Sequence, residues 1–317
     1  MTKKKRGRRR NLRPALMTVG VIVAILTFLL VLFINRSQGS DISDSDHIYT
    51  EAINDDMDTT ISDILHKLEM LESKVDQGMW QYYDFDNNSL EDIVAIFMNE
   101  HGLNASNFSM SYELSDKTLS YNFAENVFRT AASVYKVPLN MYYYDLENNG
   151  EVSPTANVRG YNLNRIHRET IVNSDNEMSE ALYSNLGSYY HYRELMAEYC
   201  EQEYPNVYYR ENVINTAYMQ CILRRIYENS QQYEQLIEYM KESNPGQYLK
   251  NNDVDVEIAH KYGLYDGAVN DVGIVYTEKP YFISVFTQDV WNADSVIGEL
   301  SALMTSYTNF VIYMRGN

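Results

Sequence analysis

Residues 128–138 have the sequence FRTAASVYKVP, and the rest of the chain is organised around this stretch. It places Ser133 three residues before Lys136, where an apolar run predicts the start of a helix. Residues three apart lie about one helical turn from each other on the same face. A serine hydroxyl is a weak nucleophile until a neighbouring base accepts its proton, and a lysine amine can be that base. The spacing therefore predicts that Ser133 and Lys136 share a site of nucleophilic chemistry.

Two further motifs follow in the chain. Ser174-Asp175-Asn176 occurs once, in a segment with helical periodicity that begins 41 residues after Ser133. Lys261-Tyr262-Gly263 lies on the first of three predicted strands near the end of the chain. Each motif is weak evidence alone, but their order and their placement on predicted elements are informative.

In this order, Ser-x-x-Lys, Ser-Asp-Asn and Lys-x-Gly resemble the motif set of the class A-like serine β-lactamases and penicillin-binding proteins. The resemblance extends from about residue 90 to the C-terminus. It includes residues 131–138 (AASVYKVP), which look like that family's nucleophile helix, and residues 270–275 (NDVGIV), which look like its strand after the lysine motif. Chance is therefore a poor explanation of the match.

The resemblance implies a role for each residue of the first two motifs. Ser133 would attack a carbonyl and become acylated, and Lys136 would take or relay its proton. Ser174 would pass that proton to the leaving nitrogen, while the Asn176 amide would orient Lys136 and the amide of the substrate. These four residues are the expected catalytic group.

The third motif is expected to bind substrate. By resemblance, Lys261 would supply a positive charge for a substrate carboxylate, and Gly263 would leave room along the strand edge. The backbone N–H groups of Ser133 and Leu264 would form the oxyanion hole. Tyr262 departs from the family, because it replaces the threonine or serine whose small hydroxyl would contact the carboxylate. We expect this phenol to narrow the site.

A second departure concerns deacylation. The resembled β-lactamases have a loop glutamate that activates the hydrolytic water, in a Glu-x-x-Leu-Asn setting. Residues 211–215 (ENVIN) imitate this pattern, but Thr216 then begins a predicted helix and leaves no room for a long loop. We therefore expect a shortened loop with Glu211 at a helix start, and Glu211 is an uncertain deacylation base.

The resemblance implies a serine hydrolase that forms an acyl-enzyme with a β-lactam and uses no cofactor or metal. A D-alanyl-D-alanine carboxypeptidase-like cell-wall enzyme, acting on a D-alanyl peptide, is the alternative enzyme. A non-catalytic envelope module on the same fold is the alternative outside enzymes. The intact pair of Ser133 and Lys136 favours catalysis, whereas Tyr262 mildly favours the module.

The N-terminal region differs sharply from the rest of the chain. Its first 13 residues hold eight Lys or Arg, and residues 15–34 form an uncharged stretch of 20, the length of a transmembrane helix. The positive-inside rule then places the N-terminus in the cytoplasm and the catalytic domain outside the cell membrane. A cleaved signal peptide is the alternative, but no A-x-A-like site precedes Arg36. Beyond Ser40 the chain carries 17 basic and 44 acidic residues, which argues against a nucleic-acid partner.

The predicted elements run helix, two strands, a helical insert, three strands and helix. Short links make the strands antiparallel. We expect an α+β fold in which a five-stranded antiparallel sheet has the terminal helices on one face and the all-helical insert on the other. The strands are predicted at residues 107–114, 118–123, 256–262, 269–276 and 281–287, and the terminal helices at 90–101 and 292–314. The expected domains are a basic tail (1–14), a transmembrane helix (15–34), a linker and helical stalk (35–88) and the hydrolase domain (89–317).

Two questions stay open at this level. Apolar residues from Met57 to Val75 recur at alternating steps of four and three, which indicates a short coiled-coil seam. This seam predicts a stalk that dimerises weakly, or instead a helix that packs on the domain. Cys200 and Cys221 either form a disulfide or remain two buried thiols.

Overall fold

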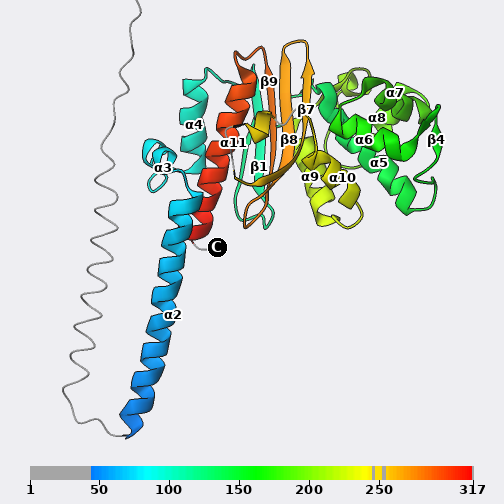
Figure 1. Cartoon of the computed structure of the whole chain (residues 1–317). Coiled ribbons are helices and arrows are strands. Elements are labelled where there is room, and N and C mark those ends of the chain that lie inside the picture. Colours follow the sequence, from blue (N-terminus) through cyan, green and yellow to red (C-terminus); the bar gives the residue numbers. More distant parts are fainter. Residues whose placement is uncertain (1–43, 245–246, 252–254, 316–317) are drawn as a thin grey trace, which may run out of the picture. The chain divides into compact units, whose positions relative to one another are not determined.

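The computed structural model describes residues 44–244, 247–251 and 255–315 (Figure 1). The predicted transmembrane span, residues 15–34, lies outside these residues. Within the part of the chain that the structure describes, no helix combines the length and the apolar character needed to cross a bilayer. The chain divides into two units at Leu65 and His66, and the boundary falls inside helix α2, Asp44–Lys74.

The second unit contains the remaining elements. Its α-helices are α3 (Gln77–Tyr83), α4 (Leu90–Glu100), α5 (Lys136–Asn148), α6 (Leu163–Val172), α7 (Asn176–Asn185), α8 (Tyr189–Ala197), α9 (Thr216–Glu228), α10 (Glu234–Lys241) and α11 (Ala293–Phe310). Its main strands are β1 (Phe108–Leu114), β2 (Ser120–Phe123), β7 (Glu257–Tyr265), β8 (Ala268–Tyr276) and β9 (Tyr281–Gln288). Short 3-10 helices are η1 (Ala132–Tyr135), η2 (Asn206–Tyr209) and η3 (Tyr248–Lys250), and a π-helical turn, η4 (Val311–Arg315), follows α11.

The main sheet is antiparallel throughout and has the strand order β2-β1-β9-β8-β7. The first hairpin therefore joins the closing three strands through β1 and β9, where Phe108 pairs with Thr287. This arrangement confirms the predicted fold class. It also leaves β7, the strand with the lysine motif, at one edge of the sheet, where a neighbouring segment can approach its backbone.

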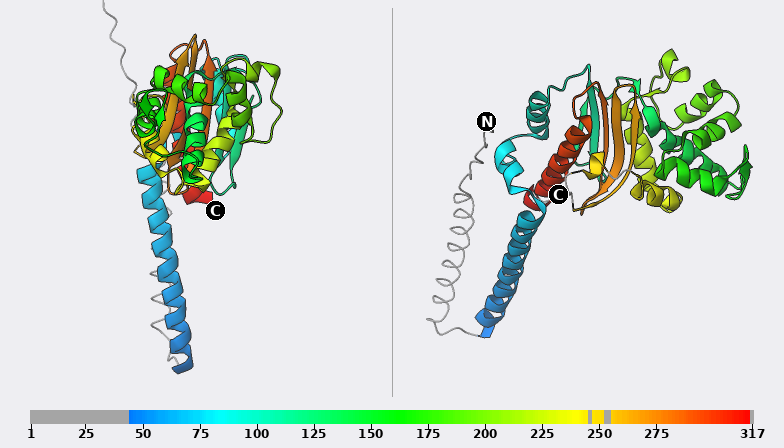
Figure 2. Two further views of the ribbon diagram at one scale, coloured as in Figure 1. Left: turned by 90° about the vertical axis from the view of Figure 1, so that its right-hand side faces the viewer. Right: turned by 45° about the horizontal axis from the view of Figure 1, so that its top comes forward.

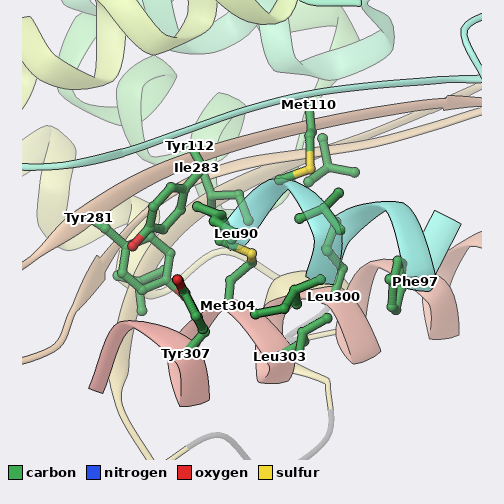
Figure 3. Packing of buried hydrophobic residues seen from close by; sticks show 14 of the residues in the cluster. Leu90, Phe97, Met110, Tyr112, Tyr281, Ile283, Leu300, Leu303, Met304 and Tyr307 are labelled. Carbon is green, nitrogen blue, oxygen red and sulfur yellow. The ribbon is translucent and has the colours of Figure 1, made fainter. Parts of the chain in front are cut away.

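Helices α4 and α11 cover one face of the sheet, as predicted for the terminal helices (Figure 3). Their apolar residues interdigitate with those of the inner strands because both patterns turn one face to the same core. Complete burial of each large apolar side chain stabilises the fold by about 1.5–3 kcal/mol. The labelled members of this core include Leu90 and Phe97 of α4, Met110 and Tyr112 of β1, Ile283 of β9, and Leu300 and Met304 of α11.

The helical insert lies on the opposite face of the sheet (Figures 1 and 2). Helices α9 and α10 contact the strands directly, and α5 to α8 pack around a further cluster beyond them. The prediction that the insert holds no strand is wrong. Two short ladders occur there: β3 (Arg129–Thr130) pairs with β6 (Val213–Ile214), and β4 (Asn157–Val158) pairs with β5 (Tyr161–Asn162). Two residues are too few for an alternating pattern to show in the sequence.

The structure shows where the apolar seam of residues 57–75 packs and how the two cysteines pair. Within α2, Ile64 and Leu65 are 38% and 52% exposed, whereas Leu71 and Val75, near and just after its C-terminal end, are buried in the core of the second unit. The C-terminal part of the seam is thus a domain-packing helix, and a dimerising role for the remainder stays a prediction. Cys200 and Cys221 form a disulfide with their Cα atoms 6.2 Å apart, which ties the segment after α8 to α9.

Candidate active site

The nucleophile turn, residues 130–133, enters η1 through a strained backbone. Ala132 has φ +49°, a left-handed conformation that costs a residue with a side chain about 1–3 kcal/mol. Two asparagine side chains support this conformation. Asn212 donates from Nδ2 to the Ala132 carbonyl (2.9 Å), and the backbone carbonyl of Asn212 accepts from the Ala131 N–H (2.8 Å). Asn270 of β8 donates to the Thr130 carbonyl (2.7 Å). Ser133 is therefore held in place by segments far apart in the sequence.

Gly263 explains how β7 reaches the nucleophile turn. A Cβ atom at this position would lie 2.7 Å from the Ser133 backbone nitrogen and 2.8 Å from the Ala131 carbonyl oxygen. Side chains essentially never approach backbone so closely, so only glycine permits the contact. Leu264 follows on the same edge strand and is half exposed. The geometry brings the edge strand and the nucleophile turn together, and the oxyanion role of Leu264 stays a prediction.

Lys136 begins α5 and is completely buried. Its Nζ donates to the Ser174 carbonyl (2.6 Å), to Asn176 Oδ1 (2.8 Å) and to Ser174 Oγ (3.3 Å). Burial lowers the pKa of Lys136 to about 8, although Asp175 opposes the shift. About a tenth of this amine is therefore unprotonated at pH 7, far more than for an ordinary lysine, and a proton acceptor must be unprotonated.

The Ser-Asp-Asn motif reaches Lys136 because it forms a helix N-terminus. Ser174 has φ +58°, and Asp175 caps α7 by accepting from the Met178 N–H (2.8 Å). Asn176, the first residue of the helix, is thereby aimed at the ammonium. No hydrogen bond joins the Ser133 hydroxyl to any residue that the structure describes. Catalytic hydrogen bonds often tighten only when substrate binds.

Lys261 differs from its expected arrangement. Its side chain is fully buried, its Nζ donates to the Tyr262 carbonyl (2.9 Å), and the ammonium lies over the Tyr262 ring, 3.9 Å from the centroid. Burial, and then repulsion by Lys136, lower the pKa of Lys261 to about 7. Tyr262 stacks on Tyr248, with ring centroids 5.3 Å apart. Burial raises the pKa of Tyr262, and the Ser174 hydroxyl opposes this shift.

The expectation for Glu211 as a helix-start residue is wrong. Helix α9 begins at Thr216, because the Asn215 side chain caps it by accepting from the Tyr218 N–H (2.8 Å). Glu211 is exposed in a bend before β6, whereas the next residue, Asn212, contacts the nucleophile turn. The order η2, bend, β6, α9 agrees with a short loop after the Glu-x-x-Leu-Asn-like stretch. A role of Glu211 in deacylation stays a prediction.

Sequence reasoning missed the residues whose side chains hold the backbone around the site in place. Asn212 and Asn270 gave no signal, because a single asparagine is usually a surface or turn residue. Arg193 is also fully buried; it donates from Nε to the Tyr208 carbonyl (2.8 Å) and from Nη2 to the Val213 carbonyl (2.5 Å). It thereby fixes the segment that carries Asn212. An isolated arginine on a helix predicts no such contact.

A family model described as the beta-lactamase enzyme family matches residues 155–308. No curated protein matches the chain in sequence. Among solved structures, a β-lactamase from Chitinophaga pinensis DSM 2588 has TM-score 0.59 and 19% identity, over 70% of this chain and 100% of its own.

Two other solved structures are similar to the same degree. The protein PBP-A has TM-score 0.59 and 15% identity, over 70% of this chain and 96% of its own. The extended-spectrum β-lactamase TLA-3 has TM-score 0.58 and 16% identity, over 68% of this chain and 98% of its own. At such identities the likeness concerns the fold. Residues from the first hairpin to α11 therefore form a domain with the β-lactamase-like serine hydrolase fold.

Proposed function

We propose that this protein is a serine hydrolase that forms an acyl-enzyme through Ser133. The observation that carries the proposal is the position of Lys136. Its amine is buried, has a lowered pKa and is held by two residues of the Ser-Asp-Asn motif, Ser174 and Asn176. A lysine that only stabilised the fold would gain little from such desolvation. A lysine that accepts a proton during acylation requires it.

The chemistry then follows from the groups present. Ser133 Oγ attacks the carbonyl carbon of an amide or ester, and its proton passes to Lys136. The carbonyl oxygen becomes an oxyanion, which the N–H groups of Ser133 and Leu264 stabilise. When the bond to the leaving nitrogen or oxygen breaks, Ser174 delivers its proton to that atom and takes the proton that Lys136 holds, across their contact of 3.3 Å. The leaving group is thereby neutral, and Lys136 is again unprotonated. A water molecule then cleaves the ester on Ser133 and restores the hydroxyl.

A β-lactam is the proposed acyl donor, which makes β-lactam hydrolysis with slow deacylation the proposed activity. A variant of PBP-A has been solved as an acyl-enzyme complex with penicillin G, which supports this choice at 15% identity. A carboxypeptidase-like enzyme of the cell wall would use the same residues on a D-alanyl peptide. The non-catalytic module would share the fold but would leave the lowered pKa of Lys136 without a purpose.

The first prediction is that Ser133 acylates and then releases the product slowly. The full-length protein, purified in detergent, is incubated with a fluorescent penicillin and with an uncharged chromogenic ester, and the adduct is followed by intact mass. We expect an adduct on Ser133 that persists, because hydrolysis also needs a base that holds water near the ester. Losing a positioned general base typically slows a step by about 10²–10⁴-fold.

Two variants and one negative result decide between these functions. Ser133→Ala should show no adduct with either reagent. Rapid turnover that collapses in Glu211→Gln would assign deacylation to Glu211 and contradict slow release. Absence of an adduct with both reagents, on a folded protein, would reject the hydrolase and favour the non-catalytic module.

We also propose that residues 15–34 anchor the protein in the cell membrane as a single pass, with residues 1–14 in the cytoplasm and the hydrolase domain outside. The uncharged 20-residue stretch and the eight preceding basic residues support this topology. An external location would bring the site to β-lactams and to cell-wall peptides. The disulfide between Cys200 and Cys221 agrees with an oxidising compartment.

A further inference from the structure

Tyr262 covers the ammonium of Lys261, the charge that the resemblance assigns to a substrate carboxylate. The Lys261 ammonium donates to the carbonyl of Tyr262 and lies over its ring. Burial raises the pKa of the Tyr262 phenol, and the neighbouring Ser174 hydroxyl opposes this shift. The small hydroxyl that the motif would otherwise present at position 262 is replaced by the ring itself. The strand edge therefore presents an aromatic group where an anion would otherwise find a small hydroxyl and a positive charge.

We propose that Tyr262 fills the carboxylate subsite, so that the site prefers amides and esters without a carboxylate beside the scissile bond. The inference rests on the proposed acyl-enzyme chemistry of Ser133 and narrows its donors: a β-lactam with a masked carboxylate should acylate Ser133 faster than a free-acid β-lactam or a D-alanyl peptide. Tyr262 is then a specificity-determining residue, and the intact motif residues around it act on uncharged acyl donors.

The burial of Lys261 supports this assignment. Its side chain has no exposed surface, so a carboxylate reaches the ammonium only after the Tyr262 ring moves away. The ring has a second partner, because it stacks on Tyr248 with the two planes 15° apart. Displacing it would remove the cation–π contact and the stacking contact together. An uncharged substrate does not need the Lys261 ammonium, so it can bind without displacing the Tyr262 ring.

The surface beyond the site fits the same class. Leu264 and Tyr265, the next two residues that follow Gly263 on β7, are 50% and 69% exposed. They form the exposed end of the edge strand along which a substrate would lie. These side chains offer apolar contact and no positive charge. A neutral, partly apolar group next to the scissile bond is therefore better matched to this edge than an anionic one.

The test uses two reagents that differ by one charge: benzylpenicillin and its methyl ester. Acylation rates of Ser133 are measured by intact mass on the full-length protein in detergent, for wild type, Tyr262→Thr and Tyr262→Phe. The quantity compared is the ratio of the ester rate to the acid rate. Intrinsic reactivity of the two reagents cancels when this ratio is compared between variants.

We expect the wild type to favour the methyl ester and Tyr262→Thr to lower the ratio by roughly 10- to 100-fold, because Lys261 and the new hydroxyl become available to the carboxylate. Tyr262→Phe keeps the ring and should keep the wild-type ratio. Tyr82→Thr, at an exposed position of α3 outside the site, is the matched control and should also keep it. Circular dichroism checks that each variant is folded.

The outcomes separate the inference from the function on which it rests. An adduct that forms with an unchanged ratio in Tyr262→Thr overturns the inference and leaves the hydrolase intact. A ratio that falls as far in Tyr262→Phe as in Tyr262→Thr also overturns it, because the hydroxyl rather than the ring would then exclude the carboxylate. No adduct with either reagent in any folded variant rejects the hydrolase itself.

Discussion

At the scale of single residues, the site depends on two lysines that the fold deprives of water. Lys136 and Lys261 are both fully buried, and burial is the largest cause of the lowered pKa of each. Lys136 keeps three hydrogen-bond acceptors from the Ser-Asp-Asn motif, whereas Lys261 keeps a carbonyl and an aromatic ring. The first environment suits a proton acceptor. The second suits a charge that is withheld from substrate.

The pH dependence of acylation follows from the pKa of Lys136. Only the unprotonated amine accepts the Ser133 proton, so acylation should be slow at acid pH. It should rise by up to about tenfold per pH unit and level off above pH 8 or so, well below the ordinary pKa of lysine, 10.5. The rate is measured between pH 6 and 10 with an uncharged ester, so that the charge of the substrate does not change.

Two variants control this measurement. Lys136→Arg stays protonated over the whole range and should lose the rise. Lys241→Ala should keep it, because Lys241 lies in α10, where Glu238 and Glu257 raise the pKa of its amine. A rise that persists in Lys136→Arg would show that another group, with Lys261 the first candidate, accepts the proton.

At the scale of elements, the contact between β7 and the nucleophile turn sets the geometry of the site. Gly263→Ala would place a methyl group against the Ser133 nitrogen and the Ala131 carbonyl, which are backbone atoms that cannot rotate away. We expect a loss of about 1–3 kcal/mol in the free energy of unfolding, together with a severe loss of acylation. Urea denaturation and the ester assay measure the two effects.

Gly78→Ala is the matched control for this prediction. Gly78 lies in α3, where an added Cβ would meet only the end of the Asp76 side chain. It should keep full acylation and near wild-type stability. Wild-type acylation in Gly263→Ala would contradict the idea that close approach of β7 positions Ser133.

The sequence indicates the main elements and misses the supports between them. The closing strands and the first hairpin are predictable because their alternating patterns extend over several residues, and their observed bounds differ from the predicted ones by a few residues at most. The β3–β6 ladder and the caps of Asn215 and Asp175 depend on contacts or boundaries that no periodicity encodes. Glu211 was misplaced for this reason, since Asn215 determines where α9 begins.

The same limit applies to the candidate site. Residue type and order predicted a shared site for Ser133, Lys136 and the Ser-Asp-Asn motif. The structure brings Lys136 and that motif together, and the catalytic roles stay a prediction. The roles of Asn212, Asn270 and Arg193 could not be predicted, since each acts through a backbone carbonyl brought near by the fold. The covering of Lys261 by Tyr262 was equally hidden, although the unusual tyrosine marked the position.

At the scale of the whole molecule, the N-terminal tail and the rest of the chain carry opposite net charges. Eight basic residues precede the uncharged stretch 15–34, and the residues after Ser40 carry 27 more acidic than basic groups. A strongly acidic hydrolase domain would be repelled from the anionic cytoplasmic leaflet, while the basic tail would be attracted to it. Charge and hydrophobic length thus favour the same orientation.

The last prediction tests this orientation in intact cells. Tags are placed before Lys3 and after the C-terminus, and protease is added from outside. The C-terminal tag should be lost and the N-terminal tag retained, because residues 15–34 keep the basic tail on the cytoplasmic side. Permeabilised cells provide the control, in which both tags should become accessible. Protection of the C-terminal tag in intact cells would place the domain in the cytoplasm, away from external β-lactams and cell-wall peptides. Loss of the N-terminal region from the mature protein would instead indicate a cleaved signal peptide, which would keep the external location but remove the anchor.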